Sequence, residues 1–186
     1  MNLLSHVSSI ISISNELEAE LNSISKKTKF KKGEIIIEVD ERCSNLYFIE
    51  KGLVRGYYFD EAKEITSWFA EEGDFATSFY SFISKEPSSE TIQALEDCEV
   101  VRLSYATLQN LYAKFPETER IGRIITESYY IKLEERMLSI QFKTAKERYD
   151  KLVSSNPSLL QRASLGQIAT YLGITQETLS RIRAEF

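Results

Sequence analysis

Histidine and cysteine are scarce in this sequence. Among 186 residues there is one histidine, His6, and there are two cysteines, Cys43 and Cys98, far apart in the chain. Two isolated cysteines form neither a disulfide framework nor a zinc or iron–sulfur motif, so we expect both thiols to be inert. A single histidine leaves no ligand set for haem or zinc, and we interpret His6 as a packing or surface residue. No metal is expected, and no cofactor is identified.

The sequence also lacks the patterns of an enzyme or a membrane protein. It contains no Ser-His, Cys-His or phosphate-loop constellation, and its histidine lies outside the strand-rich region, where a cupin-type enzyme would need ligands. We therefore predict that the chain is not an enzyme. No run approaches the roughly eighteen apolar residues of a membrane span, and the N-terminus lacks a basic start and a small-residue cleavage site. A cytoplasmic protein without a membrane partner is expected.

Positive charge is scarce overall but is concentrated toward the C-terminus. The net charge of −5 argues against a non-specific coat for nucleic acid. From residue 143 onward, seven Lys or Arg stand against four Asp or Glu, a balance of +3 that leaves −8 for residues 1–142. A balance of +3 is a weak electrostatic footprint for a DNA-binding segment, and a dimer would double it.

Two short helices joined by a tight turn are predicted near the C-terminus. Ile168 and Leu172 fall four apart on the first helix, and Leu179 and Ile182 fall three apart on the second, so each helix buries one face. Gly173 supplies the left-handed backbone that a sharp helix exit requires. The expected motif is a helix-turn-helix.

Cap residues and an outward polar set complete this prediction. Ser164 and Thr175 each stand one residue before an apolar pattern, where a hydroxyl can accept from free N–H groups. The outward face carries Gln, Glu and Arg, which are suited to base edges in a major groove. The outward residues are Leu165, Gln176, Glu177, Ser180, Arg181 and Arg183. An ordinary helical hairpin is the alternative.

This region resembles the helix-turn-helix of the catabolite-activator and fumarate-nitrate-regulator (Crp/Fnr) superfamily, in the stretches IATYLGIT and ITQETLSRIR. The resemblance implies that Gln176, Glu177 and Arg181 read bases. Members with Arg at the first of these positions read guanine there, so the operator sequence does not carry over to Gln176. The phosphate-contacting positions that it implies are Ser164, Thr175 and Thr178, and Ser180 completes the expected DNA-binding set. The sequence ends at Phe186, before the β-wing that many members carry.

Period-two patterns separated by glycine turns predict strands in the first half of the chain. Many short strands at regular spacing indicate a closed antiparallel barrel or jelly roll rather than a parallel sheet. The expected strands are residues 34–39, 45–50, 53–59, 64–69, Phe75 onward, 92–95 and 100–103. Two short helices are predicted before them, in residues 3–24.

The strand-rich region resembles the cyclic-nucleotide-binding β-roll of the same superfamily, in the stretches KKGEIII, LYFIEKGLVRGYY and EEGDF. Members that bind cyclic AMP carry a Gly-Glu pair after the GDF stretch, whose Glu holds the ribose, and a later Arg-Ser or Arg-Thr pair, whose Arg neutralises the phosphate. The matching pairs here are Thr77–Ser78 and Ser88–Ser89, and no cation stands between Lys85 and Arg102. Because an unpaired buried anion is costly, cyclic AMP is not expected as the effector.

An aromatic and hydroxyl-rich segment stands in place of that phosphate-binding cassette. An apolar cavity with a few convergent hydroxyls suits a small neutral or weakly polar ligand. The expected lining of this effector pocket is Thr77, Ser78, Phe79, Tyr80, Ser88 and Ser89. The alternative is that the aromatic side chains simply fill the barrel.

A long helix is predicted after Pro116. Apolar residues recur at threes and fours as far as Phe142, without Gly or Pro from Arg123 onward. Part of this stripe must cover the barrel, and the remainder is placed to meet a second copy. In the superfamily this position is the dimer helix. The predicted stripe is Ile121, Ile124, Ile125, Ser128, Ile131 or Lys132, Glu135, Leu138 and Phe142. A capping box of Thr144 and Glu147 is predicted to start the next helix.

These patterns predict an α+β protein of three parts. They are an antiparallel β-roll, or jelly roll, with flanking helices in residues 1–116, a long dimerisation helix in 117–142, and an all-α helix-turn-helix domain in 143–186. The predicted function is sequence-specific transcription regulation, in which a small effector repositions the helix-turn-helix through the dimer helix. The expected partners are a second copy, an inverted-repeat operator and an unknown effector, with RNA polymerase as a further candidate. The alternative is a ligand-binding or interaction module whose helix-turn-helix no longer engages DNA.

Overall fold

The computed structural model describes residues 1–184, which form two compact units. The first comprises Met1–Gly56 and Phe69–Glu127, and the second comprises Tyr57–Trp68 and the chain from Ser128 onward. These units differ from the predicted division at residues 116 and 142. The division instead lies within the long helix, and the tip of one hairpin belongs with the C-terminal helices.

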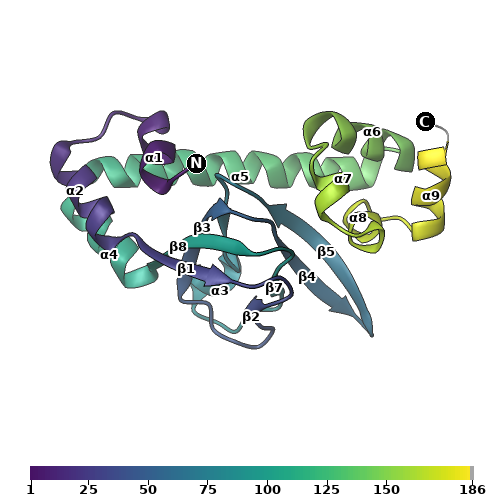
Figure 1. Ribbon diagram of the computed structural model, residues 1–186, viewed down its shortest axis with the longest axis horizontal. Coiled ribbons are helices and arrows are strands. Elements are labelled where there is room, and N and C mark those ends of the chain that lie inside the picture. The colour runs from purple at the N-terminus through teal and green to yellow at the C-terminus, as the bar shows by residue number, and fades with distance from the viewer. Residues whose placement is uncertain (185–186) are drawn as a thin grey trace. The chain divides into compact units, whose positions relative to one another are not determined.

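Two four-stranded sheets form the β-roll (Figure 1). Their strand orders are β1-β8-β3-β6 and β2-β7-β4-β5, and β8 pairs antiparallel with both β1 and β3, in line with the antiparallel pairing that the sequence predicted. The strands are β1 (Lys26–Phe30), β2 (Ile35–Ile37), β3 (Asn45–Lys51), β4 (Val54–Asp60), β5 (Lys63–Ala70), β6 (Phe75–Ala76), β7 (Thr91–Ala94) and β8 (Cys98–Ser104). Seven of these match expected strands, whereas β1 was missed.

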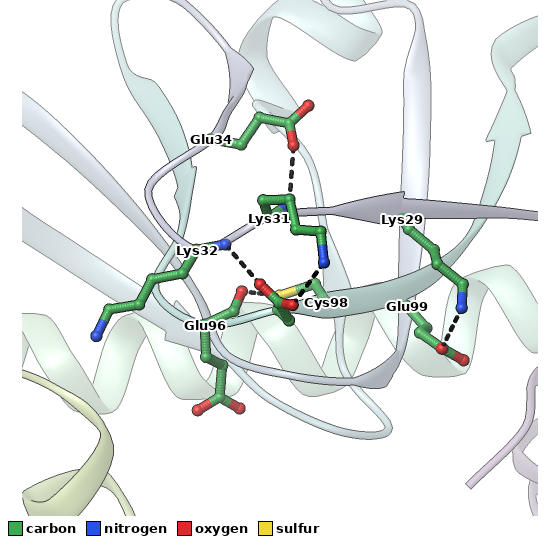
Figure 2. Close-up of polar contacts among 8 residues, drawn as sticks. Lys29, Lys31, Lys32, Glu34, Glu96, Cys98 and Glu99 are labelled. Carbon is green, nitrogen blue, oxygen red and sulfur yellow. Dashed lines mark hydrogen bonds and ion pairs between the residues drawn. The ribbon is translucent and has the colours of Figure 1, made fainter.

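Strand β1 lies at the edge of its sheet, and lysines in β1 and directly after it pair with acids on β8, on β3 and just before β8. Lys29 Nζ lies 2.8 Å from Glu99 Oε1, and Lys31 Nζ lies 2.8 Å from Asp97 Oδ2 (Figure 2). Lys27 Nζ makes a similar pair with Glu50 at 2.7 Å. Exposed pairs of this kind add little stability, but charged side chains keep an edge strand from pairing with other chains. The lysine-rich run is therefore largely neutralised locally.

Helices cover one face of the β3–β8 sheet and form the core of the first unit. The helices are α1 (Leu3–Ile10), α2 (Asn15–Ile24), α4 (Tyr105–Lys114) and the start of α5 (Pro116–Phe142). The first two confirm the prediction for residues 3–24, whereas α4 was not predicted. The buried cluster comprises Leu3, Val7, Leu17, Leu21, Phe48, Val101, Leu103, Leu111, Phe115 and Ile121. Because Ile121 belongs to this cluster, the first part of the predicted α5 stripe does cover the β-roll.

His6 packs against this core as an aromatic side chain. Its ring centroid lies 5.2 Å from that of Phe48 and 5.7 Å from that of Phe75. Burial lowers the pKa of His6, and the nearby Asp74 carboxylate partly opposes this shift. These contacts agree with the interpretation of His6 as a packing residue.

The second unit contains four short helices after α5, grouped toward the C-terminus (Figure 1). They are α6 (Ala145–Ser155), α7 (Leu159–Arg162), α8 (Leu165–Tyr171) and α9 (Gln176–Ala184). The predicted capping box starts α6: Thr144 N donates to Glu147 Oε2 at 2.7 Å, and Glu147 N donates to Thr144 Oγ1 at 3.3 Å. None of the helices in residues 1–184 is long and apolar enough to cross a membrane.

Gly52 provides a test of the β-roll packing. Its φ is +109°, and a Cβ there would lie 2.5 Å from Cys98 Sγ and 2.9 Å from Cys98 Cα. Gly33 is a matched control, because its φ of +86° is also positive but its surroundings are open. We expect Gly52→Ala to lower the free energy of unfolding by about 2 to 5 kcal/mol and Gly33→Ala by about 1 kcal/mol, as measured by urea unfolding. Equal losses for the two variants would contradict the close packing at Gly52.

Candidate nucleic-acid interface and effector site

The last two helices pack through a small apolar core. Ile168 is 1% exposed, Leu172 4%, Leu179 0% and Ile182 7%, as the helical spacing predicted. Ala169, at 1% exposed, lets the helices approach closely. Each buried Leu or Ile contributes about 1.5 to 3 kcal/mol, so this core holds α9 firmly against α8.

The turn between these helices is a Schellman motif. Gly173 has a φ of +65°, and its N–H donates to Thr170 O at 3.0 Å. Ile174 N donates to Ala169 O, also at 3.0 Å. These two bonds satisfy carbonyls at the end of α8 and fix the direction in which the chain enters α9.

Both predicted N-caps are present. Ser164 Oγ accepts from Gln167 N at 3.3 Å, and Gln167 Oε1 accepts from Ser164 N at 2.9 Å, which makes a capping box. Thr175 Oγ1 accepts from Thr178 N at 3.2 Å and donates to Thr178 Oγ1 at 3.2 Å. The hydroxyls of Ser164 and Thr175 thus hold the starts of the two helices.

The predicted base-reading side chains face solvent. Gln176, Glu177 and Arg181 are all exposed on α9, opposite the buried Leu179 and Ile182. The other predicted DNA-binding residues, Ser164, Thr175 and Ser180, are also exposed, and Thr178 is half-buried. Six of the seven predicted DNA-binding residues are therefore accessible to solvent.

Charge is distributed unevenly along α9. The pKa of Glu177 is lowered by hydrogen bonds from the Glu177 backbone N–H and from the Thr175 side chain, and also by the positive charge of Lys63. This carboxylate therefore stays ionised at the helix N-terminus. Arg181 and Arg183 lie in the last turn. An anion-accepting surface on this helix therefore depends on the arginines.

Gly166 has a role that the sequence did not reveal. The side-chain amide of Gln176 occupies the space that a Cβ on Gly166 would need, near Ser164 Oγ. A larger residue at position 166 would push Gln176 aside. The sequence gives only a weak indication of this contact, because a glycine in the first turn of a helix can have several other causes.

The predicted effector segment differs from expectation. Residues Phe79–Ser84 form a helix, α3, that was not predicted, and Phe79 and Tyr80 are 57% and 63% exposed. These two rings are therefore not buried in the barrel, whereas Phe82 is 2% exposed and its ring centroid lies 5.3 Å from that of Tyr105. In a helix, Phe79 and Tyr80 are neighbours on adjacent sides and both face solvent, whereas a strand would have turned one of them inward.

The hydroxyls of this segment bond within the fold. Ser88 Oγ donates to Ser78 Oγ at 2.8 Å and also lies 2.7 Å from Glu90 O. Thr77 Oγ1 donates to Asn45 O at 2.9 Å. Ser89 is exposed. An effector that used Thr77, Ser78 or Ser88 would have to compete with these internal bonds, and the pocket stays a prediction.

Arg55 is a buried cation that the sequence analysis overlooked. It is 3% exposed on β4, and its Nη2 and Nε donate to Gln93 Oε1 at 2.8 and 3.1 Å. Its sequence context, VRGYY, reads as a strand in which Arg55 would be expected on a solvated face. Every residue from Val54 to Tyr57 is instead buried.

Both cysteines are buried thiols. Burial raises the pKa of Cys98 to about 11, so its thiol stays protonated. Cys43 Sγ donates to Asn45 O at 3.3 Å. Within residues 1–184, no group of three or more His, Cys, Asp and Glu side chains is arranged to hold a metal ion.

Comparison with known proteins shows what this chain is similar to. Residues 27–115 match the model of the cyclic nucleotide-binding domain. The anaerobic regulatory protein of Aggregatibacter actinomycetemcomitans is 28% identical over 189 residues, covering 92% of this chain and 71% of that protein. The fumarate and nitrate reduction regulatory protein of Yersinia pestis is 28% identical over 186 residues, covering 92% and 73%. These matches support a regulator of the Crp/Fnr family.

Solved structures agree with this Crp/Fnr assignment at the level of the fold. FixK2 from Bradyrhizobium japonicum superposes with a TM-score of 0.71 at 23% identity, covering 86% of this chain and 83% of its own. A CooA variant from Carboxydothermus hydrogenoformans gives a TM-score of 0.74 at 22% identity, covering 100% and 84%. The α+β class predicted from the sequence, with a β-roll, a long helix and a helix-turn-helix, is therefore confirmed.

The similarity to these regulators supports transcription regulation as the function, as the sequence predicted. The relatives described above are regulatory proteins, which agrees with the expectation of a regulator rather than an enzyme. Members of the family bind DNA and act as dimers, so DNA and a second copy are supported as partners at this general level.

The cap at Thr175 can be tested without DNA. Thr175→Ala removes the acceptor for Thr178 N, and we expect the free energy of unfolding of the C-terminal helices to fall by about 1 kcal/mol. Ser180→Ala, at an exposed hydroxyl of the same helix, should change stability by less than about 0.5 kcal/mol. Circular dichroism during thermal unfolding measures both. A loss for Ser180→Ala as large as that for Thr175→Ala would argue against the cap.

Proposed function

We propose that this regulator binds an inverted-repeat operator as a homodimer, with one α9 in each of two successive major grooves. Gln176, Glu177 and Arg181 read base edges, and the hydroxyls of Ser164, Thr175, Thr178 and Ser180 lie toward the phosphates. The supporting observation is the division of α9 into a buried face, with Leu179 and Ile182, and an exposed face that carries the polar side chains.

An exposed apolar face on α5 supports the homodimer. Tyr130, Leu133, Met137 and Ile140 recur at intervals of three and four and are 65%, 65%, 51% and 41% exposed. Contiguous exposed apolar side chains on a helix are typical of an interaction surface, and this spacing suits a second helix packed alongside. Three members of the predicted stripe, Ile131, Leu138 and Phe142, are also exposed, at 55%, 46% and 77%.

The proposed effector is a small neutral or weakly polar molecule bound by the β-roll. The positions that match the ribose-holding Glu and the phosphate-pairing Arg are Ser78 and Ser88, whose hydroxyls bond to each other. A phosphate placed there would meet hydroxyls in place of a guanidinium, and its desolvation would be uncompensated. Effector binding is proposed to shift the dimer between two arrangements through α5, and RNA polymerase is proposed as the partner that reads the outcome.

Arg181 provides the most specific test of base reading. The wild-type protein is incubated with genomic fragments, and the tightest bound fragment is compared with its scrambled sequence at about 0.1 M salt. Arg181→Ala should reduce the free-energy difference between the two duplexes by about 1 to 3 kcal/mol, because a bidentate base contact is lost. Arg183→Ala removes the same charge from the same helix turn and should weaken both duplexes alike. Unchanged discrimination in Arg181→Ala would remove that residue from base reading.

The same assay separates the alternative function. A helix-turn-helix that no longer engages DNA would show no fragment preference at any salt concentration, and the proposal would then fail.

Cyclic AMP binding tests the proposal for the effector site. Isothermal titration with the full chain should show no saturation up to about 1 mM cyclic AMP, because Ser88 stands where cyclic AMP binders carry the phosphate-pairing Arg and no cation follows between Lys85 and Arg102. A catabolite activator that binds cyclic AMP serves as the positive control. Saturable binding in the micromolar range would overturn the exclusion of cyclic AMP.

A further inference from the structure

The second half of α5 holds the last turn of α8 through one arginine. The Cζ atom of Arg136 lies 4.2 Å from the centroid of the Tyr171 ring, and its Nη2 donates to Tyr171 O at 2.9 Å. Both side chains are half-buried. The guanidinium therefore makes a stacking contact and a hydrogen bond with the same residue of α8.

This bond completes the hydrogen bonding at the end of α8. The carbonyls of Ala169 and Thr170 accept from Ile174 N and Gly173 N, and the carbonyl of Ile168 accepts from Leu172 N. The Tyr171 carbonyl accepts from Arg136. A cation at a helix C-terminus is also favoured by the helix dipole. Arg136 thus acts on the turn that aims α9.

Other contacts bring the same turn against its neighbours. A Cβ on Gly173 would lie 3.2 Å from Ile140 Cδ1 of α5, and Thr66 N donates to Thr170 Oγ1 at 3.2 Å. The bonds from Arg148 Nη1 to Lys143 O and from Lys151 Nζ to Glu135 Oε2, both at 2.7 Å, instead connect α5 and its end with α6. Arg136 is therefore the charged link in this set that reaches α8.

We propose that Arg136 is a positioning residue for DNA reading. We call its hydrogen bond and stacking contact with Tyr171 the clasp. The clasp fixes α8 against α5, and because the Gly173 turn joins α8 to α9, it also fixes the direction of α9. The two recognition helices of a dimer are then held at a defined separation. This inference rests on the proposed function and assigns no DNA contact to Arg136.

Arg136→Met tests the clasp, with Arg123→Met as the matched control. Arg123 lies on the same helix and makes an exposed pair with Glu127 at 2.7 Å, so the control removes the same charge without touching α8. The probe is the genomic duplex bound most tightly by the wild type. Arg136→Met should weaken binding roughly two- to thirtyfold, while Arg123→Met should leave it unchanged. Equal binding by the wild type and Arg136→Met would overturn the proposal.

The salt dependence distinguishes positioning from direct contact. The slope of log K against log salt is negative. Loss of a phosphate contact makes it shallower by about one, whereas loss of a positioning residue leaves it unchanged. A shallower slope for Arg136→Met than for the wild type would therefore contradict the proposal. Arg136→Lys keeps the charge but loses the planar fork, and it should bind as weakly as Arg136→Met.

A double-mutant cycle tests the partner. Tyr171→Phe keeps the ring and the backbone carbonyl and should bind like the wild type, whereas Tyr171→Leu should weaken binding. Combining Tyr171→Leu with Arg136→Met should cost little more than Arg136→Met alone, because both changes break the same clasp. Fully additive effects would overturn the link between the two residues.

Hydrogen exchange without DNA separates this inference from the proposed function. In Arg136→Met, the amides of α8 and α9 should exchange faster, while those of β3 and β8 should not change. A wild-type protein that prefers no DNA sequence would refute the proposed function, and faster exchange in α8 and α9 would still support the clasp. Unchanged exchange in all these elements would refute the clasp itself.

Discussion

The packing of α9 against α8 is the constraint on which the function depends. Leu179 and Ile182 fill the core between these helices, and Gly173 admits the turn that brings them there. Once those two side chains are buried, helical geometry leaves Gln176, Glu177 and Arg181 in solvent. Few further contacts are needed to hold this motif, because the caps at Ser164 and Thr175 fix the starts of α8 and α9 and the Schellman turn fixes the end of α8.

The β-roll and the helix-turn-helix are joined by two continuous parts of the chain. Helix α5 belongs to the first unit up to Glu127 and to the second from Ser128. Strands β4 and β5 also cross the division, because Tyr57–Trp68 belongs to the second unit. Under the proposed function, the backbones of α5 and of this hairpin are the two routes along the chain by which a change in the β-roll would reach the C-terminal helices.

Local features of the fold could be predicted from the sequence, whereas features set by distant contacts could not. The caps at Thr144, Ser164 and Thr175 depend on residues three positions away, so their spacing was sufficient. Strand β1 was missed because KKTKF has little apolar alternation and forms by pairing with β8, some seventy residues later. Helix α3 was missed because its aromatic residues suggested a cavity lining.

The same distinction between local and distant features holds for the candidate site. The outward face of α9 follows from helical periodicity, and the exposure of Gln176, Glu177 and Arg181 was expected. The clasp of Arg136 on Tyr171 joins residues 35 positions apart, which no local pattern encodes. Exposed apolar side chains of the second half of α5 include both predicted residues, such as Leu138 and Phe142, and others, such as Leu133, so one sequence gives only a weak periodic signal for the dimer face.

The central claim is that two copies of α9, one helical turn apart, read an operator through Gln176, Glu177 and Arg181. Helical phasing tests it most directly: about 5 base pairs, half a turn of DNA, are inserted between the half-sites of the bound genomic duplex. The account predicts that affinity falls to that of a single half-site, because the second recognition helix then meets the wrong face of the duplex. Affinity that is indifferent to the insertion would contradict it.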